Sequence, residues 1–207
     1  TKSGRHAFDY LTSYTQARSA ANAIVGSTVL QNLNECGASI GPPQSMQQTC
    51  NEIRTGPHHF LVPAPDNMGS ALTRSIAASA ASYEARFGNR SIQMHGDMAI
   101  TNASLVFDGY QNAGQDVDAL YTLSWTSASR SILIEFAAHL AMGSDVSGAG
   151  SGIGYGSGNG AGSISGGSYH VRLGRLDGSA FGAEKGGVLL GTHRPDEDGD
   201  AGGERFV

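Results

Sequence analysis

Alternating apolar and polar positions dominate the second half of the chain. From residue 91 onward the period is two, which is typical of β-strands because successive side chains point to opposite faces. Turn-forming residues such as Asp108-Gly109 and Asp177-Gly178 separate the apolar runs. Strands of this number and spacing indicate a mainly β fold, an antiparallel β-sandwich of the jelly-roll or immunoglobulin-like kind. The six predicted strands cover residues 91–100, 103–107, 119–125, 131–140, 168–176 and 187–190.

The first half of the chain has helical patterns instead. Apolar residues spaced by three and four over residues 72–87 predict one helix, and the alanine-bearing stretch 14–33 predicts a second, weaker one. Residues 36–69 contain five prolines and predict an irregular region, in which 59–62 has the pattern of a short strand. We therefore expect one or two helices flanking the sheet. The expected caps of the helix over residues 72–87 are Asn67 or Ser70 at its start and Gly88 at its end.

These elements divide the chain into three expected parts. An extended arm comes first, followed by a helical and irregular region that packs on the sheet, and then by the sandwich itself. The sandwich carries a glycine-rich segment, residues 143–167, and an acidic tail, residues 194–207. The arm covers residues 1–13, the helical and irregular region 14–90, and the sandwich 91–207.

Glycine alternates with other residues along part of the glycine-rich segment. As a surface loop, such a stretch stays mobile, because glycine loses the most conformational entropy on ordering. As a strand, it shows bare backbone on one face, which another sheet or subunit can approach closely. We favour the second arrangement, with the glycines packed within an assembly. The glycines concerned are Gly148, Gly150, Gly152, Gly154, Gly156, Gly158, Gly160 and Gly162.

Composition and charge narrow the class of protein. The chain has 207 residues, of which 30 are glycine and 15% are charged, and its net charge is −5. This length and mild charge predict a folded domain with a modest core. The slightly acidic balance, with Lys2 and Lys185 as the two lysines, argues against nucleic acid and anionic membranes as partners. The sequence has no apolar run long enough to predict a transmembrane segment.

The cysteines and two sequons favour an extracellular location. Cys36 and Cys50 bracket thirteen residues rich in glycine and proline, which suits a loop closed by a disulfide. Two unpaired, buried thiols are the alternative. Asn89 and Asn102 each begin an N-glycosylation sequon. We expect a secreted or cell-surface protein with one disulfide.

Candidate metal and catalytic residues are few. Asp196, Asp198 and Asp200 alternate in the acidic tail and are candidate ligands of calcium, with a solvated tail as the preferred interpretation. The adjacent His58 and His59 point to opposite faces of an extended chain and do not readily share a metal ion. We expect no other cofactor. No nucleophile elbow, zinc-protease motif or paired-carboxylate site is present, so we expect no enzymatic activity.

Histidines and aromatic residues of the predicted strands have two interpretations each. His95, His139 and His170 lie on separate predicted strands, where a histidine more often packs than binds a ligand. Four aromatic residues offer a platform for sugar rings, although core packing is the preferred interpretation. The four are Tyr121, Trp125, Tyr155 and Tyr169.

The segment Gly154–Leu173, with Ala138-His139-Leu140 before it, resembles part of a group of uncharacterised secreted bacterial cell-surface proteins. These proteins have a glycine-rich stretch, then Ile-Ser-Gly, a Tyr-His pair and an apolar strand. The chain differs from them at Tyr155, where they have tryptophan, and at Ser168, where they have proline. The resemblance covers about a quarter of the chain. It implies a prealbumin-like or immunoglobulin-like β module at the cell surface, and it implies no catalytic residue.

Together these patterns predict an extracellular structural protein without enzymatic activity. We expect it to self-assemble into a homo-oligomer or polymer, as a filament, sheath or surface layer, by strand addition. The donated strand would be the arm, residues 1–13, or the alternating glycines. The main alternative is a cell-surface adhesive or carbohydrate-binding module, with calcium as its candidate cofactor. A secreted hydrolase, whose site forms only in the fold, is a third and weaker possibility.

Overall fold

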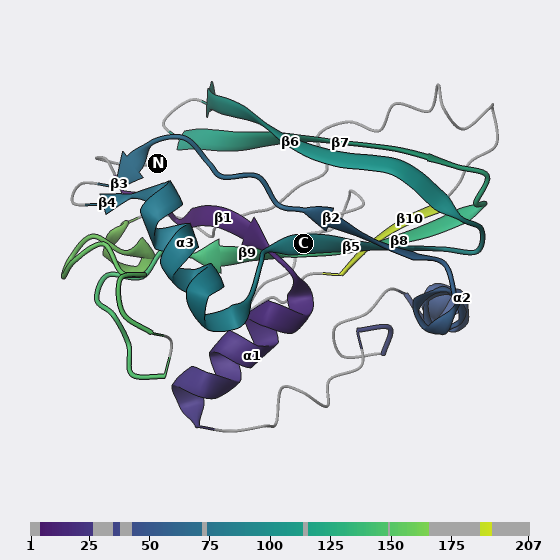
Figure 1. The fold of residues 1–207 in the computed structure, drawn as a ribbon, viewed down its shortest axis with the longest axis horizontal. Helices are drawn as coiled ribbons and strands as arrows, with labels where there is room; N and C mark the ends of the chain where they lie inside the picture. The colour runs from purple at the N-terminus through teal and green to yellow at the C-terminus, as the bar shows by residue number, and fades with distance from the viewer. Residues whose placement is uncertain are drawn as a thin grey trace.

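The structure is a computed structural model that describes residues 5–26, 35–37, 43–71, 74–113, 116–148, 150–165 and 187–191. This part of the chain is mainly β, with ten strands and three α-helices (Figure 1). Its strands form one four-stranded sheet and three antiparallel pairs. The mainly β class with flanking helices is therefore confirmed, whereas the sandwich stays a prediction.

The four-stranded sheet is the central element. It contains β2 (His59–Pro63), β5 (Ser91–Gly96), β8 (Ser131–Glu135) and β10 (Gly187–Gly191), in the order β10-β8-β5-β2. β5 runs antiparallel to both β2 and β8, whereas β10 runs parallel to β8. The short strands expected around β2 and β10 are confirmed. The parallel pair departs from the all-antiparallel sheet that the sequence pattern predicts.

A long hairpin forms a second layer of strands. β6 (Ile100–Ala113) and β7 (Asp116–Ser127) pair with each other and extend beyond the strands predicted for this region. The prediction of a turn at Asp108-Gly109 is wrong, because both residues lie within β6. The register shifts there and Gly109 has a φ of 109°, so these residues form a bulge within β6. From the inner face of the hairpin, Leu105, Leu123 and Trp125 pack on the buried side chains of the sheet.

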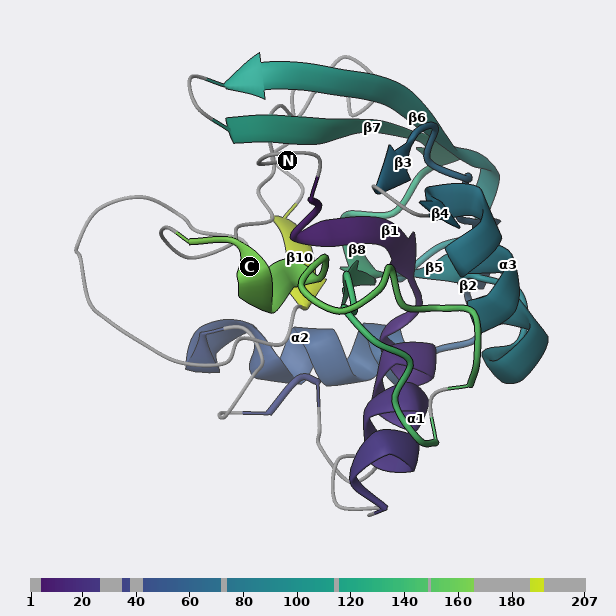
Figure 2. The ribbon, with the colours of Figure 1, turned by 90° about the vertical axis from the view of Figure 1, so that its left-hand side faces the viewer.

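A helix covers the opposite face of the sheet, so that hairpin, sheet and helix form three layers (Figures 1 and 2). This helix, α2 (Gln44–Thr55), lies where an irregular region was expected, and that expectation is wrong. Pro43 stands at its N-cap, where the missing N–H group of proline breaks no helical hydrogen bond. Met46, Cys50 and Ile53 are spaced by four and three, and they pack with Leu133 of the sheet.

A second core lies beside these layers. α1 (Tyr14–Val25) and α3 (Ile76–Phe87) pack there with β1 (Phe8–Thr12), which pairs with β9 (Ala137–Leu140). The strand expected over residues 131–140 is thus two strands, which join different sheets. Both expected helices are confirmed, although α1 is shorter than predicted and ends at Gly26.

Side chains at the helix termini explain where these helices begin and end. Ser13 and Gln16 form a capping box at the start of α1. Ser75 caps α3, in place of Asn67 or Ser70. The reason is that two short paired strands, β3 (Ser70–Ala71) and β4 (Arg74–Ser75), precede α3. Gly88 follows α3 with a φ of 88°, as a glycine at a helix end allows.

The expected N-terminal arm contributes a strand to the middle of the second core. Asp9, Tyr10 and Thr12 of β1 are buried. Pairings also cross the expected boundary at residue 90, because β1 pairs with β9 and β2 pairs with β5. The strand predicted over 168–176 and the acidic tail lie outside the described residues. Among the described helices, none has both the length and the apolar character needed to cross a membrane.

Candidate functional site

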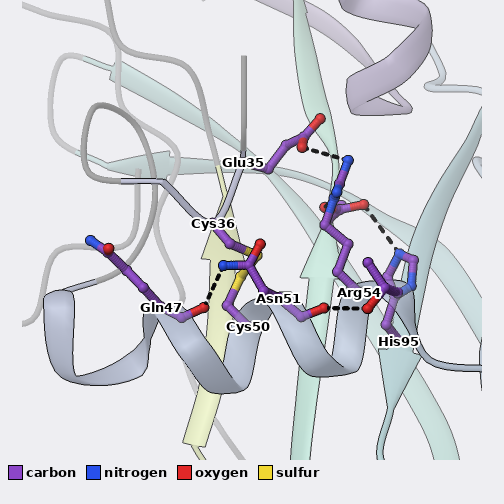
Figure 3. Close-up of a disulfide and its surroundings, with 9 residues drawn as sticks. Glu35, Cys36, Gln47, Cys50, Asn51, Arg54 and His95 are labelled. Carbon is purple, nitrogen blue, oxygen red and sulfur yellow. Dashed lines mark hydrogen bonds and ion pairs between the residues drawn. A yellow bond between two sulfur atoms is a disulfide. The ribbon is translucent and has the colours of Figure 1, made fainter. Parts of the chain in front are cut away.

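The predicted disulfide is confirmed, and it fastens α2 to the segment before it. Cys36 and Cys50 are bonded, with Cα atoms 5.6 Å apart (Figure 3). Both are fully buried beside Ile53 and Leu133. Since both cysteines are bonded to each other, neither is a candidate thiolate nucleophile.

A chain of charged side chains extends from the disulfide to the sheet; we term it the α2 cluster. Glu35 is buried and pairs with Arg18 and Arg54, at 2.7 Å from each. Arg54 reaches from α2 toward Glu35 (Figure 3) and also lies 3.5 Å from Glu135. Glu135 Oε2 lies 3.1 Å from His95 Nε2. Because a carboxylate accepts hydrogen bonds, Nε2 is the donor and carries the proton.

A second carboxylate–histidine pair lies between β1 and β9. The Asp9 carboxylate is fully buried, and its Oδ1 lies 2.8 Å from His139 Nδ1. It also accepts hydrogen bonds from the Tyr10 N–H and from the Tyr155 hydroxyl, both at 3.0 Å. We term Asp9, His139 and Tyr155 the Asp9 centre. Its carboxylate is held by three donors, so the buried charge is well compensated.

Tyrosine rings enclose the imidazole of the Asp9 centre. Tyr10 stacks on His139 with ring centroids 4.5 Å apart, and Tyr83 meets it edge-on at 5.3 Å. Burial raises the pKa of Tyr83 to about 12. Burial, aided by the Asp9 charge, also raises the pKa of Tyr10 and of Tyr155. These hydroxyl groups therefore stay protonated at neutral pH and act as neutral neighbours of the carboxylate.

Asn67 connects the Asp9 centre to the hairpin. Its Nδ2 donates to the backbone oxygen of Asp9 at 2.6 Å, and its Oδ1 accepts from the Tyr121 hydroxyl at 2.5 Å. Tyr121 lies on β7, and burial raises its pKa, so that it remains a donor. The inner face of the hairpin is therefore held by this polar link as well as by its apolar packing.

The outer face of the hairpin is exposed. Val106 and Leu120 are 52% and 39% exposed there. Hydrogen-bonded polar side chains surround them: the Ser104 and Ser124 hydroxyls lie 2.8 Å apart, and Thr122 donates to Asp108 at 2.6 Å. We term this surface, formed by both strands, the outer hairpin face. It presents apolar side chains within a frame of cross-strand hydrogen bonds.

The alternating glycines pack on the rest of the molecule. Ile153 and Tyr155 between them are fully buried, and the Ser79 hydroxyl of α3 donates to the Ile153 carbonyl at 2.6 Å. A Cβ on Gly148 would lie 2.1 Å from the Ala23 carbonyl oxygen of α1, so only glycine fits there. The strand interpretation is wrong for the described residues, because five of these glycines have positive φ. They are Gly148, Gly150, Gly152, Gly156 and Gly158.

Asp145 organises this segment. Its carboxylate accepts hydrogen bonds from the backbone N–H groups of Gly152, Ile153 and Gly154, at 2.8, 3.0 and 2.7 Å. These backbone hydrogen bonds lower the pKa of Asp145. Consecutive N–H groups of this kind form an anion-binding turn, which the chain fills with its own carboxylate. The described glycines therefore have a structural use within one molecule, and their role in assembly stays a prediction.

Other residues predicted from the sequence lie apart from one another. Asn89 and Asn102 are both exposed, and glycosylation there stays a prediction. Trp125, Tyr121 and Tyr155 point inward, as the packing interpretation predicts. No group of three or more His, Cys, Asp or Glu side chains within the described ranges is arranged to hold a metal ion. Asp196, Asp198 and Asp200 lie outside those ranges, as do Tyr169 and His170.

The sequence interpretation missed Asp9 and Glu135, the acids of the two histidine pairs. A signal was present, because Asp9 interrupts the apolar run Phe8–Leu11 and Glu135 follows the apolar run Ile132–Ile134. A single carboxylate in such a run is buried when the strand is, and it then needs a partner.

Comparison with known proteins provides no relative. No known protein family, no curated protein and no solved structure matches this chain.

Proposed function

We propose that this protein is an extracellular structural subunit that self-associates by strand addition at the β6–β7 hairpin. The observation that carries the proposal is the pairing of this hairpin. Within the described ranges, β6 and β7 form a ladder with each other and with no third strand, over 14 and 12 residues. Each strand then has a second edge of backbone N–H and C=O groups to which another strand can be added.

A second copy of the chain is the partner that suits these edges. One edge belongs to β6 and the other to β7, so pairing of β6 in one copy with β7 in the next repeats without closing. Contacts of this head-to-tail kind produce filaments or sheets. An added strand would also widen the hairpin layer that faces the four-stranded sheet, and so complete the sandwich that the sequence predicts.

The way the hairpin is held supports this role. Leu105, Leu123 and Trp125 fix its inner face to the core, and Asn67 links Tyr121 to the backbone of Asp9. A surface that is already ordered loses little conformational entropy on binding. Exposed apolar side chains on the outer hairpin face add contact area. The disulfide is compatible with the oxidising compartment in which such a subunit would assemble.

The donated strand in this proposal is the hairpin of the neighbouring copy. The arm is a poor donor, because β1 would have to leave its pairing with β9 and expose the buried Asp9 carboxylate. The described glycines pack against α1 and α3 and would also have to leave their own molecule. Hairpin-to-hairpin pairing requires neither rearrangement.

Light scattering after size-exclusion chromatography and negative-stain imaging test the proposal. We expect concentration-dependent, ordered polymers from the unmodified chain. Val106→Lys should shift the protein to monomers, because a lysine on an edge strand opposes pairing with a like strand. The matched control is Ile24→Lys, which places the same charge on α1 at a position that is 40% exposed. A monomeric unmodified chain, or equal assembly of the two folded variants, would contradict the proposal.

A further inference from the structure

His59 and His95 are neighbours across the edge of the four-stranded sheet. They are direct partners in the β2–β5 register, and side chains of such partners lie on the same face. Their ring centroids are 6.4 Å apart. Two imidazoles bound to one ion at the usual metal–nitrogen distance of about 2.1 Å have centroids roughly 5 to 6.5 Å apart. The observed spacing lies near the upper end of that range, and the His59 side chain is exposed.

The second ring nitrogen of His95 has the properties of a metal ligand. Since Nε2 donates to Glu135, the lone pair of the neutral ring is on Nδ1. This Nδ1 is buried and has no hydrogen-bond partner among the described residues, and His95 as a whole is only 8% exposed. A buried polar atom without a partner is uncommon and requires an explanation. A metal ion shared with His59 provides one.

The surroundings of His95 match the usual support of a metal-bound histidine. Such a histidine commonly donates its other N–H to a carboxylate, which fixes the ring and raises its basicity. Glu135 has this position, and Arg54 holds Glu135 in turn. The α2 cluster contains two glutamates and two arginines, so its formal charge, with His95 neutral, is zero. An incoming dication therefore does not meet a net positive charge.

We infer that His59 and His95 form a two-imidazole binding site for a divalent transition-metal ion, with Glu135 as its positioning residue. Imidazole nitrogens favour Zn²⁺, Cu²⁺ and Ni²⁺, whereas calcium prefers oxygen ligands. No third protein ligand is grouped with them among the described residues, so water or an external ligand completes the coordination. The site is separate from the outer hairpin face, because these histidines share the face of the sheet with Leu133, which packs against α2.

Metal titration of the full chain tests this inference with a matched pair of variants. His59→Gln removes the exposed ligand, whereas His58→Gln removes the adjacent imidazole and leaves the proposed site intact. We expect the unmodified chain and His58→Gln to bind Cu²⁺ with an electron paramagnetic resonance spectrum of two imidazole nitrogens. Zn²⁺ should raise the melting temperature of both. His59→Gln should lose the two-nitrogen spectrum, the thermal shift and at least tenfold in affinity.

Glu135→Gln separates positioning from ligation. It should keep the two-nitrogen spectrum and weaken Zn²⁺ binding roughly 10- to 100-fold, as loss of a supporting carboxylate does at known sites. The inference would be overturned by an unmodified chain that binds none of the three ions at 100-fold molar excess. Identical affinities and spectra for His59→Gln and His58→Gln would overturn it equally. His58→Gln and His59→Gln change side chains outside the buried core, so the comparison between them does not depend on tolerance of a core substitution.

Discussion

Two carboxylate–histidine pairs lie in the part of the chain that the structure describes, and their surroundings differ. Asp9 and His139 lie 2.8 Å apart among tyrosine rings, and every neighbour that donates to Asp9 besides the histidine is neutral. Glu135 and His95 lie 3.1 Å apart in a cluster that also contains Glu35, Arg18 and Arg54. The same two residue types therefore serve two purposes. In the Asp9 centre the pair is part of the packing, whereas in the α2 cluster it leaves one ring nitrogen unpartnered.

The difference follows from what surrounds each carboxylate. Asp9 is fully buried in its core, and three hydrogen-bond donors converge on its carboxylate. Glu135 shares Arg54 with Glu35, and the Arg54 side chain is 32% exposed. Water can therefore replace part of the solvation that each carboxylate provides to Arg54. We therefore expect the Asp9 centre to matter most for stability and the α2 cluster to tolerate change better.

Removal of each carboxylate tests this comparison and should have the largest effect. Asp9→Ala leaves the His139, Tyr10 and Tyr155 donors buried without their acceptor, and we expect a loss of about 3–5 kcal/mol in the free energy of unfolding. Glu135→Ala should cost roughly 1–3 kcal/mol, because Arg54 keeps Glu35 as a partner. Urea denaturation followed by circular dichroism measures both values. An equal or larger loss for Glu135→Ala would reverse the comparison.

Removal of the disulfide should cause the next largest loss in the free energy of unfolding. Its structural consequences should be confined to the region around the α2 cluster. Replacing Cys36 and Cys50 together by serine should cost about 3 kcal/mol, the chain entropy of a loop of this length. Glu35 is next to Cys36, so the ion pairs of Glu35 should also weaken. Hydrogen exchange should then accelerate in α2 more than in β1.

Reduction of the unmodified protein by dithiothreitol should reproduce the exchange pattern of the double variant. Faster exchange in β1 to the same extent as in α2 would show that the two regions are not separable. Unchanged exchange in α2 would show that the disulfide does not stabilise the α2 cluster.

Local patterns predicted the elements but not the pairings that build the sites. The apolar spacing in α3 and the alternation in β8 are contained within one element, so they could be read directly. α2 was missed because prolines near a helix start and prolines within an irregular segment look alike in sequence. The pairing of His59 with His95 depends on strand register, which alternation alone does not determine.

The glycine-rich segment shows a different limit of sequence interpretation. A period of two is shared by a strand with one bare face and by a series of turns in which alternate residues need positive φ. The choice between them depended on contacts from distant elements. Ser79 of α3 and Asp145 hold the backbone of Ile153, and no feature near Gly152 or Gly154 in the sequence indicates these contacts.

Substitution of a tyrosine beside the Asp9 centre should have the smallest effect on stability, and this effect should be seen at alkaline pH. Burial raises the pKa of Tyr83 to about 12, whereas a tyrosine in the unfolded chain titrates near pH 10. Between these values the unfolded chain releases the proton first, so stability is complete below about pH 10 and falls as the pH rises toward 12. Tyr83→Phe should therefore move the midpoint of alkaline unfolding to higher pH.

At pH 7 the same substitution should cost less than about 1 kcal/mol, because the hydrogen bond lost is a long one, 3.4 Å from the Thr12 hydroxyl. Tyr14→Phe is the matched variant beside the α2 cluster, where burial and Glu35 raise the pKa of Tyr14 by a smaller amount. Its alkaline midpoint should move less than that of Tyr83→Phe. Equal shifts in the two variants would mean that alkaline sensitivity belongs to buried tyrosines in general and not to the Asp9 centre, and fluorescence-monitored pH titration decides between them.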